Sequence, residues 1–318
     1  MARAWGQAEV ARRLLGISGL GPAHRGFSTL EISKEYVDEL QRRDRSSATV
    51  RRVGDVLAMA ARRIPRLDVP QAVDQVRAWM AELERNGYAG STRNKMLLEL
   101  RAAGRWAARE RLCGPVAELD RIVLVRVTSR LKPLFSVDEL QAILRRDAYG
   151  HGQSQAVGTR EAWHAVAAVL IYSGLRFSEV FALRWTDIDW SGKSILVREH
   201  AGRRLKTRRE RLVPLQSELA DILQKHKRSD SRVVNPYPNP NRLMDFVRRA
   251  GVVVGDRSPH SFRHSFASIL TATGVPQPLM AAWLGHSSHQ TTLGYAQQAA
   301  RYAQAVAGWP RGEMRLMG

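Results

Sequence analysis

A stretch near the C-terminal end, residues 258–295, constrains the fold most strongly, because it combines clear helix signals with a dense set of polar side chains. Ser258 and Pro259 open it with a capping hydroxyl and a proline at the first helical position, where a missing N–H costs nothing. The apolar residues that follow at helical spacing are Phe262, Phe266, Ile269 and Leu270. The pattern predicts one helix that buries this stripe and ends near Gly274, and then a second, short helix over residues 278–285.

Four polar residues lie at the edges of these two predicted helices. His260 and Arg263 are three positions apart, which puts them on neighbouring positions of one helix face. His286 directly follows the second helix, and Tyr295 comes nine residues later. Each residue alone is typical of ordinary packing or of a solvated surface. Together, and without a carboxylate cluster suited to a metal ion, they favour a site for an anion that accumulates charge. The phenol oxygen is then a candidate to attack that anion.

The chain carries a large excess of positive charge. Its 318 residues include 50 Lys and Arg against 30 Asp and Glu, a formal net charge of +20. With 44% hydrophobic residues, the chain is long enough for two domains with proper cores. A basic surface that serves only solubility rarely needs such an excess, so the composition favours a polyanionic partner.

The single cysteine, Cys113, rules out an intrachain disulfide and a cysteine-based zinc site, and it indicates a reducing compartment. The sequence has no apolar run of membrane-spanning length. The first residues lack the apolar core of a signal peptide, since Arg12 and Arg13 interrupt it. We therefore expect a cytoplasmic protein without membrane contact.

Composition and periodicity divide the chain into four segments. Residues 1–28 are Gly-rich and basic and predict a flexible arm. Residues 29–121 are helical in pattern, a linker without a helical stripe covers residues 122–133, and residues 134–318 form a second domain. The helices predicted in the first domain cover residues 30–40, 49–64, 72–86 and 91–112.

The second domain opens at a capping box formed by Ser136 and Glu139. A buried helix over residues 161–172 follows and ends at Gly174. Three short strands are predicted next at residues 194–199, 204–207 and 211–215, and then helices at 217–227 and 239–250. The chain is thus predicted to be mainly α, with a helical bundle followed by a mixed α+β domain that contains a small three-stranded antiparallel sheet.

Short motifs of the second domain come in a fixed order: Arg176 with Glu179, a Lys206-Thr207 pair on a turn between strands, His260-Ser-Phe-Arg263, Leu284-Gly-His286-Ser-Ser, and Tyr295. In order and spacing they resemble the tyrosine recombinase family, also called phage-type integrases. The resemblance covers the whole catalytic half of the chain. The helical half resembles that family's SAM-like core-binding domain, especially where residues 90–95 lead into an arginine-rich helix.

The resemblance implies a role for each matching residue. Arg176 and Arg263 would bind the non-bridging oxygens of the scissile phosphate, because forked donors fit a phosphorane-like state better than point charges do. His260 and His286 would hydrogen-bond the same group, with His260 also able to help take the phenol proton. Tyr295 would be the nucleophile, leaving a 3′-phosphotyrosine and a free 5′ hydroxyl.

Two further roles follow from the same resemblance. Lys206 would be the general acid for the departing 5′ oxygen, and Glu179 would brace Arg176 and the histidines. Lys206 stands among several arginines, so its assignment rests on the Lys-Thr pair and on the strand prediction. The phosphodiester energy is kept in the phosphotyrosine bond, so neither ATP nor a metal ion nor another cofactor is implied.

Basic residues of both domains are candidates for DNA contacts. Arginines that spread around a helix can be a solvated face, but in so basic a domain a phosphate-contacting helix is the better interpretation. The candidate DNA-binding residues are Arg93, Lys95, Arg101, Arg105, Arg203 and Arg204.

The resemblance favours a site-specific recombinase or integrase that exchanges double-stranded DNA through a Holliday junction. Its partners would be DNA and itself, with two protomers per site and four in the synapse, and accessory DNA-bending proteins are further candidates. Bound to DNA, the protein would be associated with the nucleoid.

One alternative is a type IB topoisomerase, which uses a closely similar residue set but relaxes DNA as a monomer. Another is a catalytically silent DNA-binding regulator, which retention of all six catalytic positions disfavours. Residues 296–309 bear on this choice, because an alanine-rich tail with an apolar stripe resembles the one that recombinases donate to a neighbouring protomer. The same tail could also fold back in cis.

Overall fold

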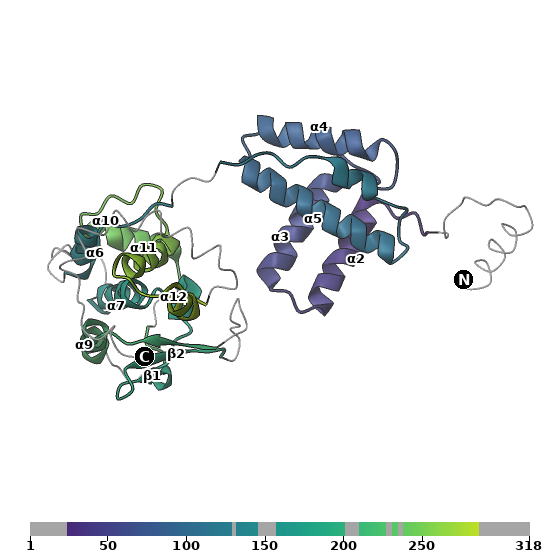
Figure 1. The fold of residues 1–318 in the computed structure, drawn as a ribbon. Helices are drawn as coiled ribbons and strands as arrows, with labels where there is room; N and C mark the ends of the chain where they lie inside the picture. Colours follow the sequence, from purple (N-terminus) through teal and green to yellow (C-terminus); the bar gives the residue numbers. More distant parts are fainter. Residues whose placement is uncertain are drawn as a thin grey trace, which may run out of the picture. The chain divides into compact units, whose positions relative to one another are not determined.

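The computed structural model describes residues 24–128, 132–145, 157–200, 210–226, 231–234 and 238–285 (Figure 1). The chain divides into two compact units, Met1–Ser129 and Arg130–Gly318. This boundary falls inside the segment 122–133 that the sequence predicts as a linker. Each unit has its own hydrophobic core and is described by itself.

The first unit is a helical bundle. Its helices are α2 (Thr29–Arg42), α3 (Ser47–Ala61), α4 (Ala72–Arg85), α5 (Gly90–Arg109) and the 3-10 helix η1 (Ala117–Arg121). Serine hydroxyls cap the first two: Ser28 accepts the N–H of Glu31, and Ser46 accepts the N–H of Thr49, both at 3.3 Å. The predicted helices of this unit are confirmed, with small shifts at their ends.

Helix α5 is the centre of this bundle, because it contacts α2, α3 and α4 (Figure 1). It buries Leu97 and Leu100 completely, and its Trp106 ring packs against Tyr36 with 5.3 Å between ring centroids. Burying one such leucine stabilises the fold by roughly 1.5–3 kcal/mol. The first unit therefore has a core that does not depend on the second.

The start of the predicted linker packs on α5. The side-chain amide of Asn94 donates to the carbonyl of Val125 and accepts its N–H, both at 2.8 Å. The first residues after η1 are therefore fastened to the bundle rather than free of it.

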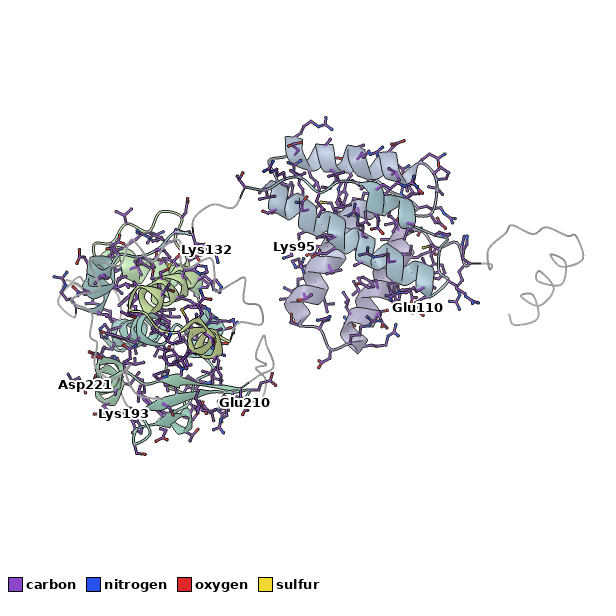
Figure 2. All side chains as sticks on the ribbon, viewed as in Figure 1. Lys95, Glu110, Lys132, Lys193, Glu210 and Asp221 are labelled. Atoms are coloured by element: carbon purple, nitrogen blue, oxygen red, sulfur yellow. The ribbon has the colours of Figure 1, made fainter. Side chains whose placement is uncertain are left out.

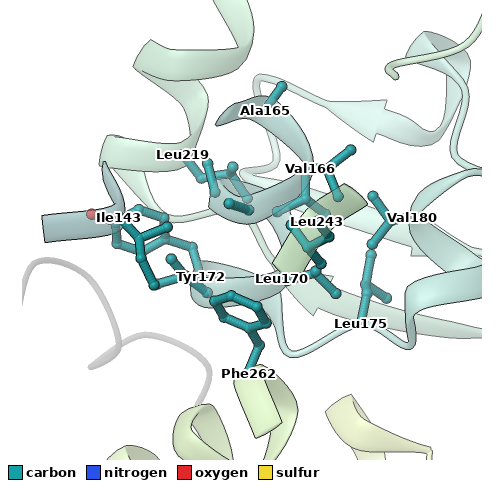
Figure 3. Close-up of a cluster of buried hydrophobic side chains, with 14 of the residues drawn as sticks. Ile143, Ala165, Val166, Leu170, Tyr172, Leu175, Val180, Leu219, Leu243 and Phe262 are labelled. Carbon is teal, nitrogen blue, oxygen red and sulfur yellow. The ribbon is translucent and has the colours of Figure 1, made fainter. Parts of the chain in front are cut away.

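The second unit is built around one buried helix. Its helices are α6 (Val137–Leu144), α7 (Val157–Ser173), α8 (Phe177–Val180), η3 (Trp185–Asp187), α9 (Ser217–His226), α10 (Pro240–Arg249), α11 (Pro259–Ala272) and α12 (Gln277–Leu284). From Ala165 to Ile171 every residue of α7 is at most 1% exposed. A helix that is apolar all round must be covered on every side, and α6, α8, α9, α10 and α11 all contact it. Figure 3 shows Val166 and Leu170 of α7 among Val180, Leu219, Leu243 and Phe262.

A small antiparallel sheet of order β1-β2-β3 completes the described part of this unit. Its strands are β1 (Ile188–Asp189), β2 (Ser194–Val197) and β3 (Arg211–Pro214), with Ile195 opposite both Ile188 and Val213. Strands were predicted at two of these places. The sheet gains β1, which the sequence analysis did not predict, whereas the strand predicted at 204–207 lies outside the described residues. A mainly α fold with a three-stranded antiparallel sheet is confirmed.

The two helices predicted from residues 258–285 are present as α11 and α12. Ser258 caps α11, with its hydroxyl accepting the N–H of His260 at 3.3 Å, and Pro259 is the first helical residue. Helix α12 ends at Gly285, which adopts the left-handed conformation with φ +62°. In the part of the chain that the structure describes, no helix is both long and apolar enough to span a membrane.

Candidate active site

Helix α11 supplies Arg263 and His260 from its first turns, and the two side chains differ in burial. Arg263 is 3% exposed and points inward, where its Nη1 donates to the carbonyl of Gly174 at 2.9 Å. His260 is exposed, and its ring meets that of His264 edge-on at 5.2 Å. The two predicted site residues thus share the N-terminal end of α11, with one in the core and one at the surface.

The turn after α7 positions Arg176 and Glu179. Gly174 has φ +60°, and a Cβ built there would lie 2.3 Å from Cδ1 of Phe266, so only glycine fits. The chain then reaches Arg176, the residue that precedes α8. Glu179 accepts the backbone N–H of Arg176 and its Nη1–H, both at 2.8 Å.

A second arginine holds the same carboxylate. Arg211 on β3 donates from Nη1 to Oε1 of Glu179 at 3.2 Å and from Nη2 to Oε2 at 2.6 Å. Burial by itself would raise the pKa of Glu179, but hydrogen bonds and charge from Arg211 and Arg176 outweigh it and hold that pKa below its usual value. Glu179 is therefore an ionised carboxylate in an interior position.

Three arginines converge on the last carbonyls of α12. Arg211 Nε donates to the carbonyl of Trp283 at 2.7 Å, Arg263 Nη2 donates to that of Leu284, and Arg176 Nη2 donates to that of Gly285 at 3.0 Å. Carbonyls in the last turn of a helix have no partner within it and form the negative end of its dipole. Three guanidinium groups therefore cap α12, and we call Arg176, Arg211 and Arg263 the arginine clamp.

The arginine clamp is suited to an anion. Two of its guanidinium groups, those of Arg176 and Arg211, share the single carboxylate of Glu179, and that of Arg263 donates to backbone carbonyls. The Arg176 side chain is 15% exposed, so a ligand can reach it. Forked donors bind phosphate oxygens in pairs. Among the described residues there is no group of three or more His, Cys, Asp or Glu side chains that could hold a metal ion.

A second buried carboxylate anchors the end of β2. Asp187 accepts Nε–H of Arg198 at 2.7 Å and the backbone N–H of Arg184 at 2.8 Å, and it pairs with Nε2 of His200 at 2.7 Å. Its side chain is 1% exposed. These bonds fix the chain directly before residues 201–209, the segment that carries Lys206.

The structure places Arg176, Glu179 and Arg263 around the end of α12, and the roles predicted for them remain predictions. Lys206, His286 and Tyr295 lie outside the described residues, as do Arg203 and Arg204. Their roles therefore remain predictions.

Arg211 was not among the site residues predicted from the sequence, which placed it only as the first residue of the strand at 211–215. The sequence did not mark it, because Leu212 and Val213 are both apolar and show no alternation. Leu212 is 58% exposed and Val213 is 1% exposed, so period two puts Arg211 on the buried face with Val213.

Two candidate DNA contacts are corrected by burial. Arg93 is 7% exposed and pairs with Glu84 at 2.7 Å. Arg101 is also 7% exposed, and it donates to the carbonyls of Leu119, at 2.9 Å, and Ile122. Both side chains are buried and bond within the first unit, which argues against a direct contact with DNA.

The other two candidates of α5 are on the surface. Lys95, which is labelled in Figure 2, is exposed. Arg105 is exposed as well and pairs with Asp120 at 3.1 Å. Surface ion pairs of this kind are worth little, so Arg105 can exchange Asp120 for a phosphate.

The family model of the phage integrase family matches residues 134–301, which is more than half of the chain. The chain belongs to the phage integrase family. The tyrosine recombinase XerC of Bradyrhizobium diazoefficiens is 30% identical over 241 residues, covering 69% of this chain and 71% of XerC. The tyrosine recombinase XerD of Rhizobium meliloti is 26% identical over 242 residues, covering 70% of this chain and 75% of XerD. This integrase is accordingly a tyrosine recombinase, an enzyme that cuts and rejoins DNA.

Solved structures show the same fold. A lambda integrase dimer bound to a COC′ core site aligns with a TM-score of 0.66 and 16% identity, over 85% of this chain and 95% of that one. A lambda integrase tetramer bound to a Holliday junction aligns with a TM-score of 0.64 and 16% identity, over 91% and 88%.

Proposed function

We propose that this integrase is a site-specific recombinase that exchanges strands of duplex DNA through a 3′-phosphotyrosine intermediate and a Holliday junction. The arginine clamp at the end of α12 carries the proposal, because it gathers three guanidinium groups at one helix end and one of them, that of Arg176, is partly exposed. A phosphodiester gains negative charge when it is attacked. Donors held in place before the reaction stabilise that charge without having to reorganise.

Arg176 is the member of the clamp best placed to receive the phosphate. A guanidinium has five N–H donors, and its bonds to Glu179 and Gly285 use two of them. Among the described residues, its other three N–H groups have no acceptor in a side-chain hydrogen bond and can donate to phosphate oxygens. Arg263 lies deeper, and it would reach the phosphate by exchanging its bond to the Leu284 carbonyl for one to a non-bridging oxygen.

The proposed chemistry balances without a nucleotide cofactor. The Tyr295 oxygen attacks phosphorus, and the phenol proton passes to His260 or to solvent. The bond from phosphorus to the 5′ oxygen breaks, and the leaving oxygen takes a proton from Lys206. Attack of a 5′ hydroxyl on the phosphotyrosine reverses these steps on another strand. The energy of the broken bond is kept in the new ester, and guanidinium groups supply the charge that a metal ion supplies in other enzymes.

The partners follow from the same chemistry. We propose that Lys95 and Arg105 contact DNA phosphates from α5, with Arg203 and Arg204 doing so from the second unit. Lambda integrase is seen as a dimer at a core site and as a tetramer on a Holliday junction. By analogy, we propose two protomers of this integrase per site and four in the synapse, assisted by DNA-bending proteins. Its proposed location is the cytoplasm, on the nucleoid.

The test begins with duplexes that the protein selects by binding from a random-sequence library, a step that needs no catalysis. Selected duplexes are then nicked near the cleavage site, so that a cut strand diffuses away and traps the covalent complex. Wild-type protein should give an adduct on a denaturing gel, and Tyr295→Phe should bind equally well and give none. Relaxation of plasmids without site preference would instead indicate a topoisomerase. Tight binding without any adduct from wild-type protein would refute the enzymatic proposal.

A further inference from the structure

We propose that Arg211 is a positioning residue of the active site: it holds Glu179 at the end of α12 and so sets the direction of Arg176. This inference rests on the proposed function. Arg211 touches two parts of the site from β3, with two bonds to Glu179 and one to the carbonyl of Trp283.

Four hydrogen bonds from Arg176 and Arg211 fix the orientation of the Glu179 carboxylate. Each of its oxygens accepts one bond from Arg176 and one from Arg211. Oε1 accepts Nη1–H of Arg176 at 2.8 Å and Nη1–H of Arg211 at 3.2 Å. Oε2 accepts Nη2–H of Arg211 at 2.6 Å and the backbone N–H of Arg176 at 2.8 Å. A carboxylate has about four acceptor positions, so all of them are filled and the side chain has one arrangement.

Arg211 is placed to orient Glu179 and the end of α12 rather than to contact the reacting phosphate. Its side chain is 7% exposed, and Nε, Nη1 and Nη2 each have an acceptor within the protein. To bind a DNA phosphate, Arg211 would have to give up its two bonds to the Glu179 carboxylate, whereas Arg263 would exchange only a bond to a neutral carbonyl. The effect of Arg211 on the reaction must pass through the groups that it orients.

The orienting effect of Arg211 reaches Gly285 and, through the Gly285 carbonyl, Arg176. The Gly285 carbonyl, two residues after the Trp283 carbonyl that Arg211 holds, accepts Nη2–H of Arg176 at 3.0 Å. Gly285 is also in close contact with Arg211, since a Cβ there would lie 3.2 Å from its Cδ. A shift of the α12 end would therefore move the Gly285 carbonyl that orients Arg176.

The positive charge of Arg211 is not sufficient for the proposed positioning, and a substitution that keeps the charge tests this. Lysine at this position would keep a positive charge beside Glu179. Its single ammonium group lacks the planar fork that bonds both carboxylate oxygens and the Trp283 carbonyl at once. Arg211→Lys should therefore keep most of the stability and lose the positioning, whereas Arg211→Met should lose both.

Arg257 provides a matched control in the same unit. It also joins a carboxylate to a backbone carbonyl, with bonds to Glu139 at 3.0 Å and to the carbonyl of Leu134 at 2.8 Å, but it does not contact α12 in any described bond. Arg257→Met removes a similar bridge. It reports what such a loss does to general stability.

The first measurement is hydrogen exchange of the full-length protein without DNA, which does not depend on catalysis. Arg211→Lys and Arg211→Met should speed exchange at the end of α12, including the Gly285 amide that bonds to the Ala282 carbonyl. Exchange in α7 should remain as in wild type for Arg211→Lys. Arg257→Met should leave the end of α12 unchanged. Unaltered α12 exchange in both Arg211 variants, or equal loosening in Arg257→Met, would overturn the inference.

The second measurement is single-turnover cleavage of the nicked duplex at saturating protein. A misplacement of about 1 Å can lower a catalytic rate by about 10²-fold. Arg211→Lys should lose about that factor in cleavage rate while its affinity for the duplex stays within about threefold of wild type. A loss of affinity equal to the loss of rate would mean a merely structural role. If wild-type protein formed no adduct, the proposed function would fail, while the exchange result would still decide whether Arg211 holds α12.

Discussion

Gly174→Ala is expected to be far more damaging than an ordinary glycine substitution. Gly174 has φ +60°, and a left-handed conformation costs a residue with a Cβ about 1–2 kcal/mol. The new methyl group would also lie 2.3 Å from Cδ1 and 2.9 Å from Cε1 of Phe266. This ring is 4% exposed and packs in a cluster with Leu270, Met280 and Leu284, so it has little room to retreat. Overpacking of this kind costs a further ~1–3 kcal/mol.

Gly274 is the matched control, because it has φ +80° and a Cβ there would meet nothing within 4 Å. The difference between Gly174→Ala and Gly274→Ala therefore isolates the clash with Phe266, which we expect to be ~1–3 kcal/mol. Native-state hydrogen exchange of α7 measures the unfolding free energy of the second unit by itself. Combining Gly174→Ala with Phe266→Ala should cost less than the sum of the two single changes, since the small side chain removes the clash. Equal destabilisation by both glycine variants, or strict additivity, would refute this reasoning.

Three further predictions concern the reaction, the carboxylate and the tail. Lys206→Ala should slow cleavage by about 10²–10⁴-fold, and a substrate with sulfur in place of the bridging 5′ oxygen should restore it, because a thiolate leaves without a proton. Arg176→Ala should not be rescued, and failure to rescue Lys206→Ala would assign the acid to another residue. Burial opposes ionisation of Glu179, but its bonds to Arg211 and Arg176 hold its folded pKa below the ordinary 4.5, so its contribution to stability is present above that pH and lost as pH falls through the lower value. Urea unfolding should therefore show a weaker acid dependence for Glu179→Gln, and an identical slope would contradict the assigned bonds. Deleting residues 296–318 should leave binding to a single half-site intact and reduce cooperativity on a duplex with two half-sites, which a gel-shift titration measures; unchanged cooperativity would rule out a role of the tail between protomers.

Local signals in the sequence were sufficient for the helices that frame the site. The Ser258-Pro259 cap and the apolar stripe behind it specify α11, and Gly285 marks the end of α12, because caps and periodicity act within one element. Strand β1 was not predicted because two residues are too short to show a period.

Burial of charged side chains could not be predicted in the same way. Arg101 and Arg105 are both arginines of α5, yet Arg101 bonds to carbonyls in and directly after η1, whereas Arg105 lies on the surface. Only the packing of a distant segment decides between these outcomes. Arg211 illustrates the same limit, since its partners Glu179 and Trp283 are far from it in the sequence and meet it only in the folded unit.

The most direct test of the central claim is to identify the residue that becomes linked to DNA. Trypsin should release residues 264–301 as one peptide, since no Lys or Arg lies between Arg263 and Arg301, and Tyr295 is its single tyrosine. Mass spectrometry of the trapped complex, made in the presence of excess EDTA, should find the nucleotide on this peptide, with fragmentation placing it on Tyr295. A nucleotide on the next peptide, which begins with Tyr302, or an adduct that forms only with a divalent metal ion, would contradict the account.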